Sequence, residues 1–208
     1  MNPPSVVVFD LGKVLVDYDY SIASRRILRR TRLADAEMQR LLCASPLLRQ
    51  YETGALSTAQ FYEGVRAASG YDGGLAEFSA AFADIFTEIQ PMTALHAALR
   101  AAGIPAWIFS NTNELADRHI RGRFPFFSRF DGYVLSYEQG VMKPDPRIYE
   151  VVERQTGRSG ADILYLDDRP ENMEAGLARG WRAVLHETPE KSRSHMAALG
   201  LPAGQLPS

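Results

Sequence analysis

The feature that most constrains the fold of this sequence is a series of five short apolar runs that alternate with segments of helical periodicity. The runs are rich in β-branched and aromatic residues and cover residues 6–9, 106–109, 133–135, 163–166 and 183–185. Strands covered on both faces form such unbroken apolar runs, because neither face meets water. The sequence therefore predicts an α/β fold with a parallel sheet between layers of helices.

Segments of helical periodicity stand before the second run and between the later ones. They predict helices over residues 92–102, 114–121, 146–155 and 171–179. Right-handed crossovers through such helices bring the carboxyl ends of all the strands to one edge of the sheet. Polar residues that follow the apolar runs are therefore expected to lie together.

One long interval, residues 17–90, breaks this alternation of strands and helices. It contains no convincing strand and four amphipathic helix patterns, at residues 22–30, 35–43, 58–68 and 75–86. The sequence therefore predicts a helical insert after the first strand. The domain organisation expected is a core of residues 1–16 and 91–208 that carries a helical domain of residues 17–90.

Composition excludes several classes of protein. Lys and Arg total 23 against 25 Asp and Glu, so no bulk positive field exists to bind nucleic acid or an anionic membrane. No stretch approaches the roughly 20 apolar residues of a membrane span. Cys43 is the single cysteine, which excludes an intramolecular disulfide and fits a reducing compartment. We expect a cytoplasmic protein without nucleic-acid or membrane partners.

A carboxylate, Asp10, follows the first apolar run. A carboxylate at the end of a buried strand is costly unless a cation or backbone donors pair with it. Asp10 is therefore either a metal ligand or nucleophile, or a cap of the following turn. The next two residues, Gly12 and Lys13, do not form a phosphate-binding P-loop, because the expected hydroxyl residue and preceding glycine are missing.

Short polar residues follow the second run, and a lysine precedes the third helix of the core. Ser110, Asn111, Thr112 and Asn113 either bind a phosphate oxygen together with the helix N-terminus or simply cap that helix. Lys143 stands before two prolines, on an extended loop. By itself it is either a solvated surface charge or a cation of a site.

Two adjacent carboxylates, Asp167 and Asp168, follow the fourth run. They repel each other unless a cation lies nearby, and oxygen ligands of this kind suit Mg²⁺. Capping of the next helix is the other interpretation. The order of Asp, Ser-Asn, Lys-Pro and Asp-Asp along one expected sheet edge favours a site over four unrelated structural roles.

Together these motifs resemble those of the haloacid dehalogenase (HAD) superfamily of hydrolases over nearly the whole chain. The four segments are FDLGKVLVD, WIFSNTN, VMKPDPRIY and LYLDDRPENMEAG. The resemblance implies a Rossmann-like three-layer core, with the insert as the small helical C1 cap. Within the superfamily, FDLG, YETGALSTAQFYEGV, SNTNE and KPDPRIYE are most similar to the bacterial sugar-phosphate phosphatase branch that includes the alpha-glucose-1-phosphate phosphatases.

The resemblance implies a Mg²⁺-dependent phosphatase that acts on a small phosphorylated metabolite, expected to be a sugar phosphate. By this resemblance, Asp10 is the nucleophile and forms an aspartyl-phosphate that water hydrolyses. The metal is held by Asp10, the main-chain carbonyl of Gly12 and Asp168. Asp167 and Asn172 support the metal loop. The sequence leaves both a monomer and a homodimer open.

The same resemblance assigns the residues that bind the phosphoryl group. Ser110 and Asn111 are expected to bind phosphate oxygens. Lys143 is expected to neutralise both the phosphate and the Asp10 carboxylate. Phosphoryl transfer depends mainly on such positioning and charge stabilisation.

One position departs from the common pattern of the family. Most family phosphatases have a second aspartate two residues after the nucleophile as general acid and base, and this chain has Gly12 there, as the sugar-phosphatase branch does. Acid-base help is worth roughly 10²- to 10⁴-fold in rate. Asp17 or Asp19 is either its source or a solvated or capping residue. The alternatives are a metal-free 2-haloacid dehalogenase and a weakly catalytic protein that binds a phosphorylated metabolite.

Overall fold

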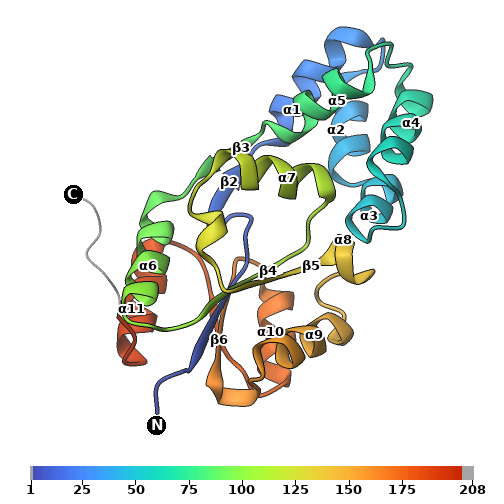
Figure 1. The fold of residues 1–208 in the computed structure, drawn as a ribbon. Helices are drawn as coiled ribbons and strands as arrows, with labels where there is room; N and C mark the ends of the chain where they lie inside the picture. Colours follow the sequence, from blue (N-terminus) through green and yellow to red (C-terminus); the bar gives the residue numbers. More distant parts are fainter. Residues whose placement is uncertain (1, 203–208) are drawn as a thin grey trace.

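The computed structural model describes residues 2–202, so residue 1 and residues 203–208 of the expected core lie outside the described part. A five-stranded parallel sheet with the order β5-β4-β1-β6-β7 forms the centre of the molecule (Figure 1). Its strands are β1 (Val6–Phe9), β4 (Ala106–Ser110), β5 (Gly132–Leu135), β6 (Ile163–Asp167) and β7 (Arg182–Leu185). All five apolar runs are strands, and the predicted α/β fold is confirmed.

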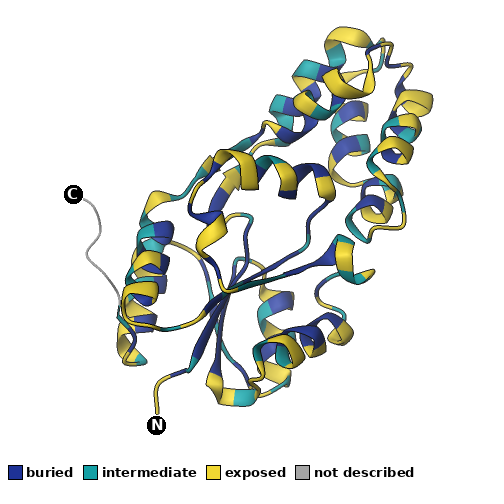
Figure 2. Ribbon diagram, in the orientation of Figure 1, coloured by how far each residue is buried: buried dark blue, intermediate teal, exposed yellow. Residues whose placement is uncertain are grey.

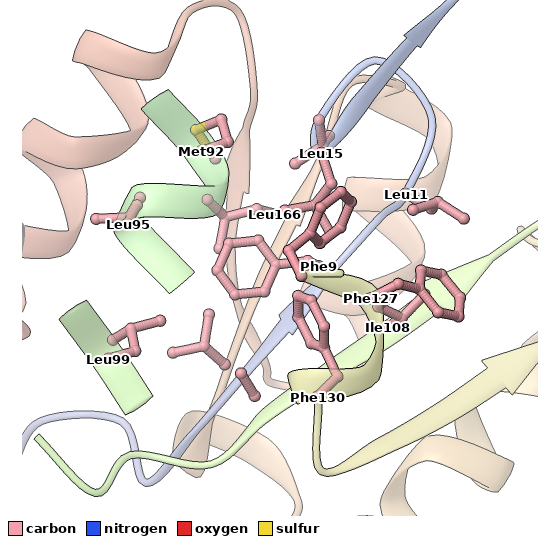
Figure 3. Close-up of a cluster of buried hydrophobic side chains, with 14 of the residues drawn as sticks. Phe9, Leu11, Leu15, Met92, Leu95, Leu99, Ile108, Phe127, Phe130 and Leu166 are labelled. Atoms are coloured by element: carbon pink, nitrogen blue, oxygen red, sulfur yellow. The ribbon is translucent and has the colours of Figure 1, made fainter. Parts of the chain in front are cut away.

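Strand β1 lies in the middle of this sheet and is buried along its whole length. Its side chains alternate between the two faces. Val7 and Phe9 pack into one apolar cluster, whereas Val6 and Val8 pack into another. Figure 3 shows Phe9 at the centre of the first cluster, beside Phe130 and Leu166. Burial on both faces explains why the run is uninterrupted rather than alternating.

Helices cover both faces of the sheet. The first face packs against α6 (Gln90–Ala101), α11 (Pro189–Ala198) and α7 (Glu114–Arg123), and the second against α9 (Pro146–Thr156) and α10 (Pro170–Ala178). The short elements of the core are α8 (Ser136–Gln139), η2 (Phe127–Arg129) and η3 (Gly160–Asp162), and η1 (Leu28–Arg30) follows the first helix of the insert. Figure 2 shows buried strands between helices that expose their outer sides. The sequence pattern predicts four of these helices but not α8 or α11.

The insert consists of five helices that project from one end of the sheet (Figure 1). They are α1 (Tyr20–Ile27), α2 (Asp35–Cys43), α3 (Pro46–Glu52), α4 (Thr58–Ser69) and α5 (Leu75–Ala83). They surround an apolar cluster that also takes in Leu115 of α7, with the rings of Phe61, Phe78 and Phe82 in mutual contact. The sequence pattern does not predict α3, and α5 ends at Ala83, three residues short of the prediction. Within residues 2–202, no helix has the length and apolarity needed to span a bilayer.

The expectation that residues 17–90 contain no strand is wrong. Strands β2 (Val16–Tyr18) and β3 (Phe86–Glu88) form an antiparallel pair, with Val16 opposite Glu88 and Tyr18 opposite Phe86. Each strand has three residues, too few for an alternating pattern to emerge in the sequence. This two-stranded ribbon contains both connections between the insert and the sheet.

Candidate active site

The carboxyl ends of β1, β4 and β6 bring the expected site residues to one place. Asp10 directly follows β1, Ser110 ends β4 and Asp167 ends β6, and β1 lies between the other two strands. Oxygen atoms of Asp10, Asp167 and Asp168 lie within 4.8 Å of one another. Carboxylates that are more than 150 residues apart in the sequence therefore form one cluster, as a shared sheet edge requires.

Lys143 is the cation of this cluster. Its ammonium lies 2.9 Å from an Asp10 oxygen and 2.7 Å from an Asp167 oxygen, and it donates to the Phe109 carbonyl at 2.9 Å. Three acceptors match the three protons of the ammonium. The side chain is 1% exposed, so the interpretation of Lys143 as a solvated surface charge is wrong.

The side chain of Asn111 holds the loop that carries this lysine. Its amide nitrogen donates to the Lys143 carbonyl at 3.0 Å, and its amide oxygen accepts from the Lys143 N–H at 2.8 Å. Both polar atoms of Asn111 are thus committed to the main chain of Lys143. A contact between Asn111 and phosphate would therefore come from its main chain unless these bonds break.

Of the four polar residues at the end of β4, one caps the following helix. Asn113 is the N-cap of α7, since its side-chain oxygen accepts the N–H of Ala116 at 3.0 Å. The N–H of Thr112 donates to the hydroxyl of Ser136 at 2.9 Å. Ser110 has only a long contact of 3.4 Å to the Asn111 carbonyl. The Ser110 hydroxyl is therefore not committed to a strong hydrogen bond and is able to turn toward a ligand in the cavity.

Asp167 is buried and fully hydrogen-bonded. It accepts from Lys143, from the Tyr165 hydroxyl, from the Arg169 N–H at 2.8 Å and from the Asn172 amide at 3.0 and 3.2 Å. Burial by itself would raise the pKa of Asp167, but the Lys143 ammonium and these donors together lower it. Asp167 is thus an anion that orients Lys143 and the segment from Asp168 to Asn172.

Asp10 and Asp168 have fewer partners. Besides Lys143, Asp10 accepts from the Leu11 N–H at 2.7 Å. Burial, opposed by Lys143 and reinforced by Asp167, raises the pKa of Asp10 to about 7. Burial and the nearby Asp167 also raise the pKa of Asp168. Three carboxylates thus lie together, and Lys143 pairs with only Asp10 and Asp167 among them. An oxygen-ligated divalent cation such as Mg²⁺ fits both the donor set and the excess negative charge.

A cavity of about 210 Å³ lies over this cluster, between the sheet edge and the insert. From the core it is lined by Asp10, Gly12, Ser110, Asn111, Lys143, Asp168 and Asn172, and from the insert by Tyr18, Tyr20, Cys43, Leu48 and Glu52. An outer cleft of about 690 Å³ adjoins it and shares Glu52, Lys143 and Arg169. The cavity therefore contains all of the sequence-predicted site residues except the buried Asp167.

The ring of Tyr18 packs closely against Gly12. A Cβ atom added to Gly12 would lie 2.8 Å from the Tyr18 Cε1, closer than such atoms approach in practice. Lys13, at φ 59°, holds this arrangement by binding the Tyr18 carbonyl at 3.0 Å and by pairing with Asp17. Asp19 accepts the Ser21 N–H as N-cap of α1, which is its expected capping role. Among the described residues neither aspartate lines the cavity.

Glu52 lines the cavity, and the sequence pattern does not single it out. It ends α3, a helix that the periodicity does not predict, and it lines both the inner cavity and the outer cleft. The available signal was its place in the YETGALST segment, one of the segments that carry the family resemblance.

Known proteins resemble this chain over most of its length. The family model described as "Hydrolase: haloacid dehalogenase-like hydrolase" matches residues 4–180. The sesquiterpene phosphatase astK of Aspergillus oryzae is 26% identical over 83% of this chain and 85% of its own length. The D-ribitol-5-phosphate phosphatase of Bacteroides thetaiotaomicron is 23% identical over 93% and 97%.

A solved structure supports the fold. The HAD family enzyme bt-2542 of Bacteroides thetaiotaomicron, crystallised with magnesium and inorganic phosphate, superposes with a TM-score of 0.77. It is 22% identical, and the match covers 88% of this chain and 93% of that chain. At this identity the likeness is one of fold.

Proposed function

Because the chain belongs to the haloacid dehalogenase-like hydrolase family, as the four motifs predict, we propose that it is a Mg²⁺-dependent phosphatase of a small phosphorylated metabolite. One observation carries this proposal above the others. The Asp10, Asp167 and Asp168 carboxylates cluster beside a cavity, and the buried Lys143 ammonium pairs with Asp10 and Asp167. A cluster of this charge and size suits a divalent cation and a phosphoryl group better than an uncharged ligand.

Asp10 is the proposed nucleophile. Its carboxylate oxygen attacks phosphorus, the bond from phosphorus to the leaving oxygen breaks, and an aspartyl-phosphate results. Water then attacks this phosphorus and releases phosphate together with the free carboxylate. Asp10, the Gly12 carbonyl and Asp168 are the proposed metal ligands. When bound, Mg²⁺ supplies charge neutralisation between the carboxylate and the phosphoryl group.

The other polar groups of the sheet edge hold the phosphoryl group in line with Asp10. Ser110 and the main chain of Asn111 are proposed to bind its oxygens, since both residues line the cavity. Lys143 is proposed to neutralise the phosphoryl group in addition to Asp10. Asp167 and Asn172 support this arrangement through the hydrogen bonds that fix Lys143 and the metal loop.

We also propose that residues 17–90 act as a C1 cap over a core of residues 1–16 and 91–208. An apolar cluster built mainly from insert residues, with Leu115 of α7, and a two-stranded connection support this division. The insert contributes Tyr18, Tyr20 and Glu52 to the cavity wall. A cap that closes over the phosphoryl group excludes water and selects the leaving group.

The proposed substrate class is a sugar or polyol phosphate, as in the alpha-glucose-1-phosphate phosphatase branch. The hydroxyls of Tyr18 and Tyr20 and the carboxylate of Glu52 offer hydrogen bonds to a polyhydroxylated leaving group. The ribitol-5-phosphate phosphatase among the relatives supports the same class. The single Cys43 supports a reducing, cytoplasmic location.

A panel of phosphomonoesters, assayed with Mg²⁺ and with EDTA, tests this function. We expect hydrolysis of small sugar phosphates that EDTA abolishes and added Mg²⁺ restores. Activity on a 2-haloacid that survives EDTA would instead identify a dehalogenase. Binding of beryllium fluoride with no turnover of any ester would identify a protein that only binds phosphorylated metabolites.

A further inference from the structure

We propose that Glu52 is the general acid and base of this site, so that the insert supplies the proton transfer that a glycine at position 12 cannot provide. This inference rests on the proposed phosphatase function. It assigns the protonation of the leaving oxygen and the activation of water to a residue outside the sheet edge.

The first support is the unpartnered state of the Glu52 carboxylate. Glu52 is partly buried and lines the cavity that contains Asp10, Lys143 and Asp168. Within residues 2–202, its side-chain oxygens form no hydrogen bond and no ion pair. A partly buried carboxylate without a protein partner is free to bond to a ligand, and no hydrogen bond or ion pair assigns its oxygens a structural role. A ligand that enters the cavity would provide the missing partner.

The second support is the way the core holds this segment of the insert. The Ser136 hydroxyl donates to the Glu52 carbonyl at 2.6 Å, and the Leu115 N–H donates to the Tyr51 hydroxyl at 3.0 Å. Gly54, at φ 68°, packs so closely that an added Cβ would lie 2.1 Å from a main-chain oxygen of α8. The main chain at Glu52 is therefore anchored to the parts of the core that follow β4 and β5, and this anchor keeps the Glu52 side chain at the cavity wall.

The third support is the electrostatic surroundings. Burial raises the pKa of Glu52 to about 7, and the Arg169 guanidinium offsets part of this rise. A general acid that also serves as a base works best when its pKa lies near the working pH. The other titratable groups of the cavity wall are Asp10, Tyr18, Tyr20, Cys43, Lys143 and Asp168.

The proposed steps balance in protons and bonds. As Asp10 attacks phosphorus, the bond to the leaving oxygen breaks, and this oxygen takes the proton of the Glu52 carboxylic acid. In the second step, a water oxygen attacks phosphorus and the bond from phosphorus to Asp10 breaks. The Glu52 carboxylate accepts the proton of that water, which returns Glu52 to its starting state.

The variant Glu52→Gln tests this role through its dependence on the leaving group. The quantity kcat/KM reports formation of the phosphoenzyme, in which an alkoxide needs a proton and a nitrophenolate does not. We expect kcat/KM to fall by roughly 10²- to 10⁴-fold for an alkyl phosphate. For p-nitrophenyl phosphate we expect a fall of less than about tenfold, since acid help is not needed there.

A second measurement tests the role of Glu52 in hydrolysis of the phosphoenzyme. Without its base, the variant should hydrolyse the phosphoenzyme slowly, so p-nitrophenyl phosphate should give a rapid burst of nitrophenolate followed by a slow steady rate. The control is Glu63→Gln, which removes an exposed cap carboxylate that pairs with Arg66. This control should match the wild type with both esters.

Equal losses with both esters and no burst would overturn the proposal and assign Glu52 to leaving-group binding. Retention of full activity by Glu52→Gln would overturn it as well. Each of these results requires a wild-type enzyme that hydrolyses both esters with Mg²⁺. If the wild type hydrolyses neither ester, the proposed phosphatase function fails, and the role of Glu52 fails with it.

Discussion

The sheet edge and the insert contribute to one cavity in different ways. The charged groups of the sheet edge are held by each other, since Lys143 bonds to three acceptors and Asp167 accepts from four residues. On the insert side, the Glu52 carboxylate has no bonding partner within residues 2–202, although its main chain is anchored. The difference suggests that the core is organised before a ligand binds, whereas the insert completes its contacts with the ligand.

The largest effect is expected from Lys143→Met, which removes the ammonium from the charge cluster of the sheet edge. Removal of the ammonium leaves Asp10 and Asp167 as buried carboxylates without their cation. We expect a loss of about 3–5 kcal/mol in the free energy of unfolding. We also expect a fall of about 10²- to 10³-fold in kcat/KM. Urea unfolding and a phosphatase assay measure the two effects.

The matched control is Lys191→Met, because Lys191 forms an exposed pair with Glu187. An exposed pair contributes about 0–1 kcal/mol, so this variant should be close to the wild type. Equal stability of the two lysine variants would contradict the account of the sheet edge as a preorganised charge cluster.

A smaller effect is expected from Asn111→Ala. This change removes the two hydrogen bonds that join the Asn111 side chain to the Lys143 main chain. Two lost hydrogen bonds, with their main-chain partners left in a partly buried site, should cost about 2–3 kcal/mol. Chemical denaturation measures this loss. A stability unchanged from the wild type would mean that the Lys143 loop holds its position without Asn111.

Lys143 and Asn111 differ from the other site residues in how far the sequence predicts their positions. Asp10, Ser110, Asp167 and Asp168 follow apolar runs, and parallel strands end at one edge, so the pattern alone brings them together. Lys143 lies on a loop, where no periodicity fixes a position, and only the family resemblance assigns it to the site. The commitment of Asn111 to a backbone depends on loop geometry that no local pattern encodes.

The sequence pattern also does not predict which insert residues face the active site. The insert helices are fixed by side-chain packing across their apolar cluster, so the pattern predicts helices but not the face that meets the active site. The pattern therefore predicts neither the position of Glu52 in the cavity wall nor the ribbon of β2 and β3. Strands of three residues carry too little periodicity to be recognised.

The core and the insert also differ in their histidines. The insert of residues 17–90 contains none, whereas the core contains the buried His96, which makes the stability of the core depend on pH. The His96 ring stacks on Phe130 at 3.7 Å, and burial lowers its pKa to about 4. The unfolded chain, with an ordinary histidine pKa of about 6.5, therefore binds more protons below neutrality. Stability should fall by about 2 kcal/mol from this residue between pH 7 and pH 5.

His96→Phe tests this assignment. The variant should lose that part of the pH dependence, so its free energy of unfolding should fall less steeply from pH 7 to pH 5. Urea titrations at the two pH values measure the difference. Identical slopes for the wild type and the variant would show that His96 is not the acid-sensitive group.

The smallest effect is expected at the contact between insert and core. Tyr51→Phe removes the hydroxyl that accepts the Leu115 N–H and contacts Thr58. We expect a loss of about 1 kcal/mol. Hydrogen exchange should report it as faster exchange of the Leu115 amide, with the amides of β1 unchanged. Faster exchange throughout the sheet would mean that the two regions unfold together.

The most direct test of the central claim is to trap the phosphoryl group on Asp10. Borohydride reduces an acyl phosphate to an alcohol, so quenching the enzyme during turnover with Mg²⁺ should convert Asp10 to homoserine. We predict that mass spectrometry finds this change at position 10 in the presence of substrate, and in neither the substrate-free enzyme nor the Asp10→Asn variant. A wild type that turns over substrate with no reduction at Asp10, or with reduction at another carboxylate, would contradict the account.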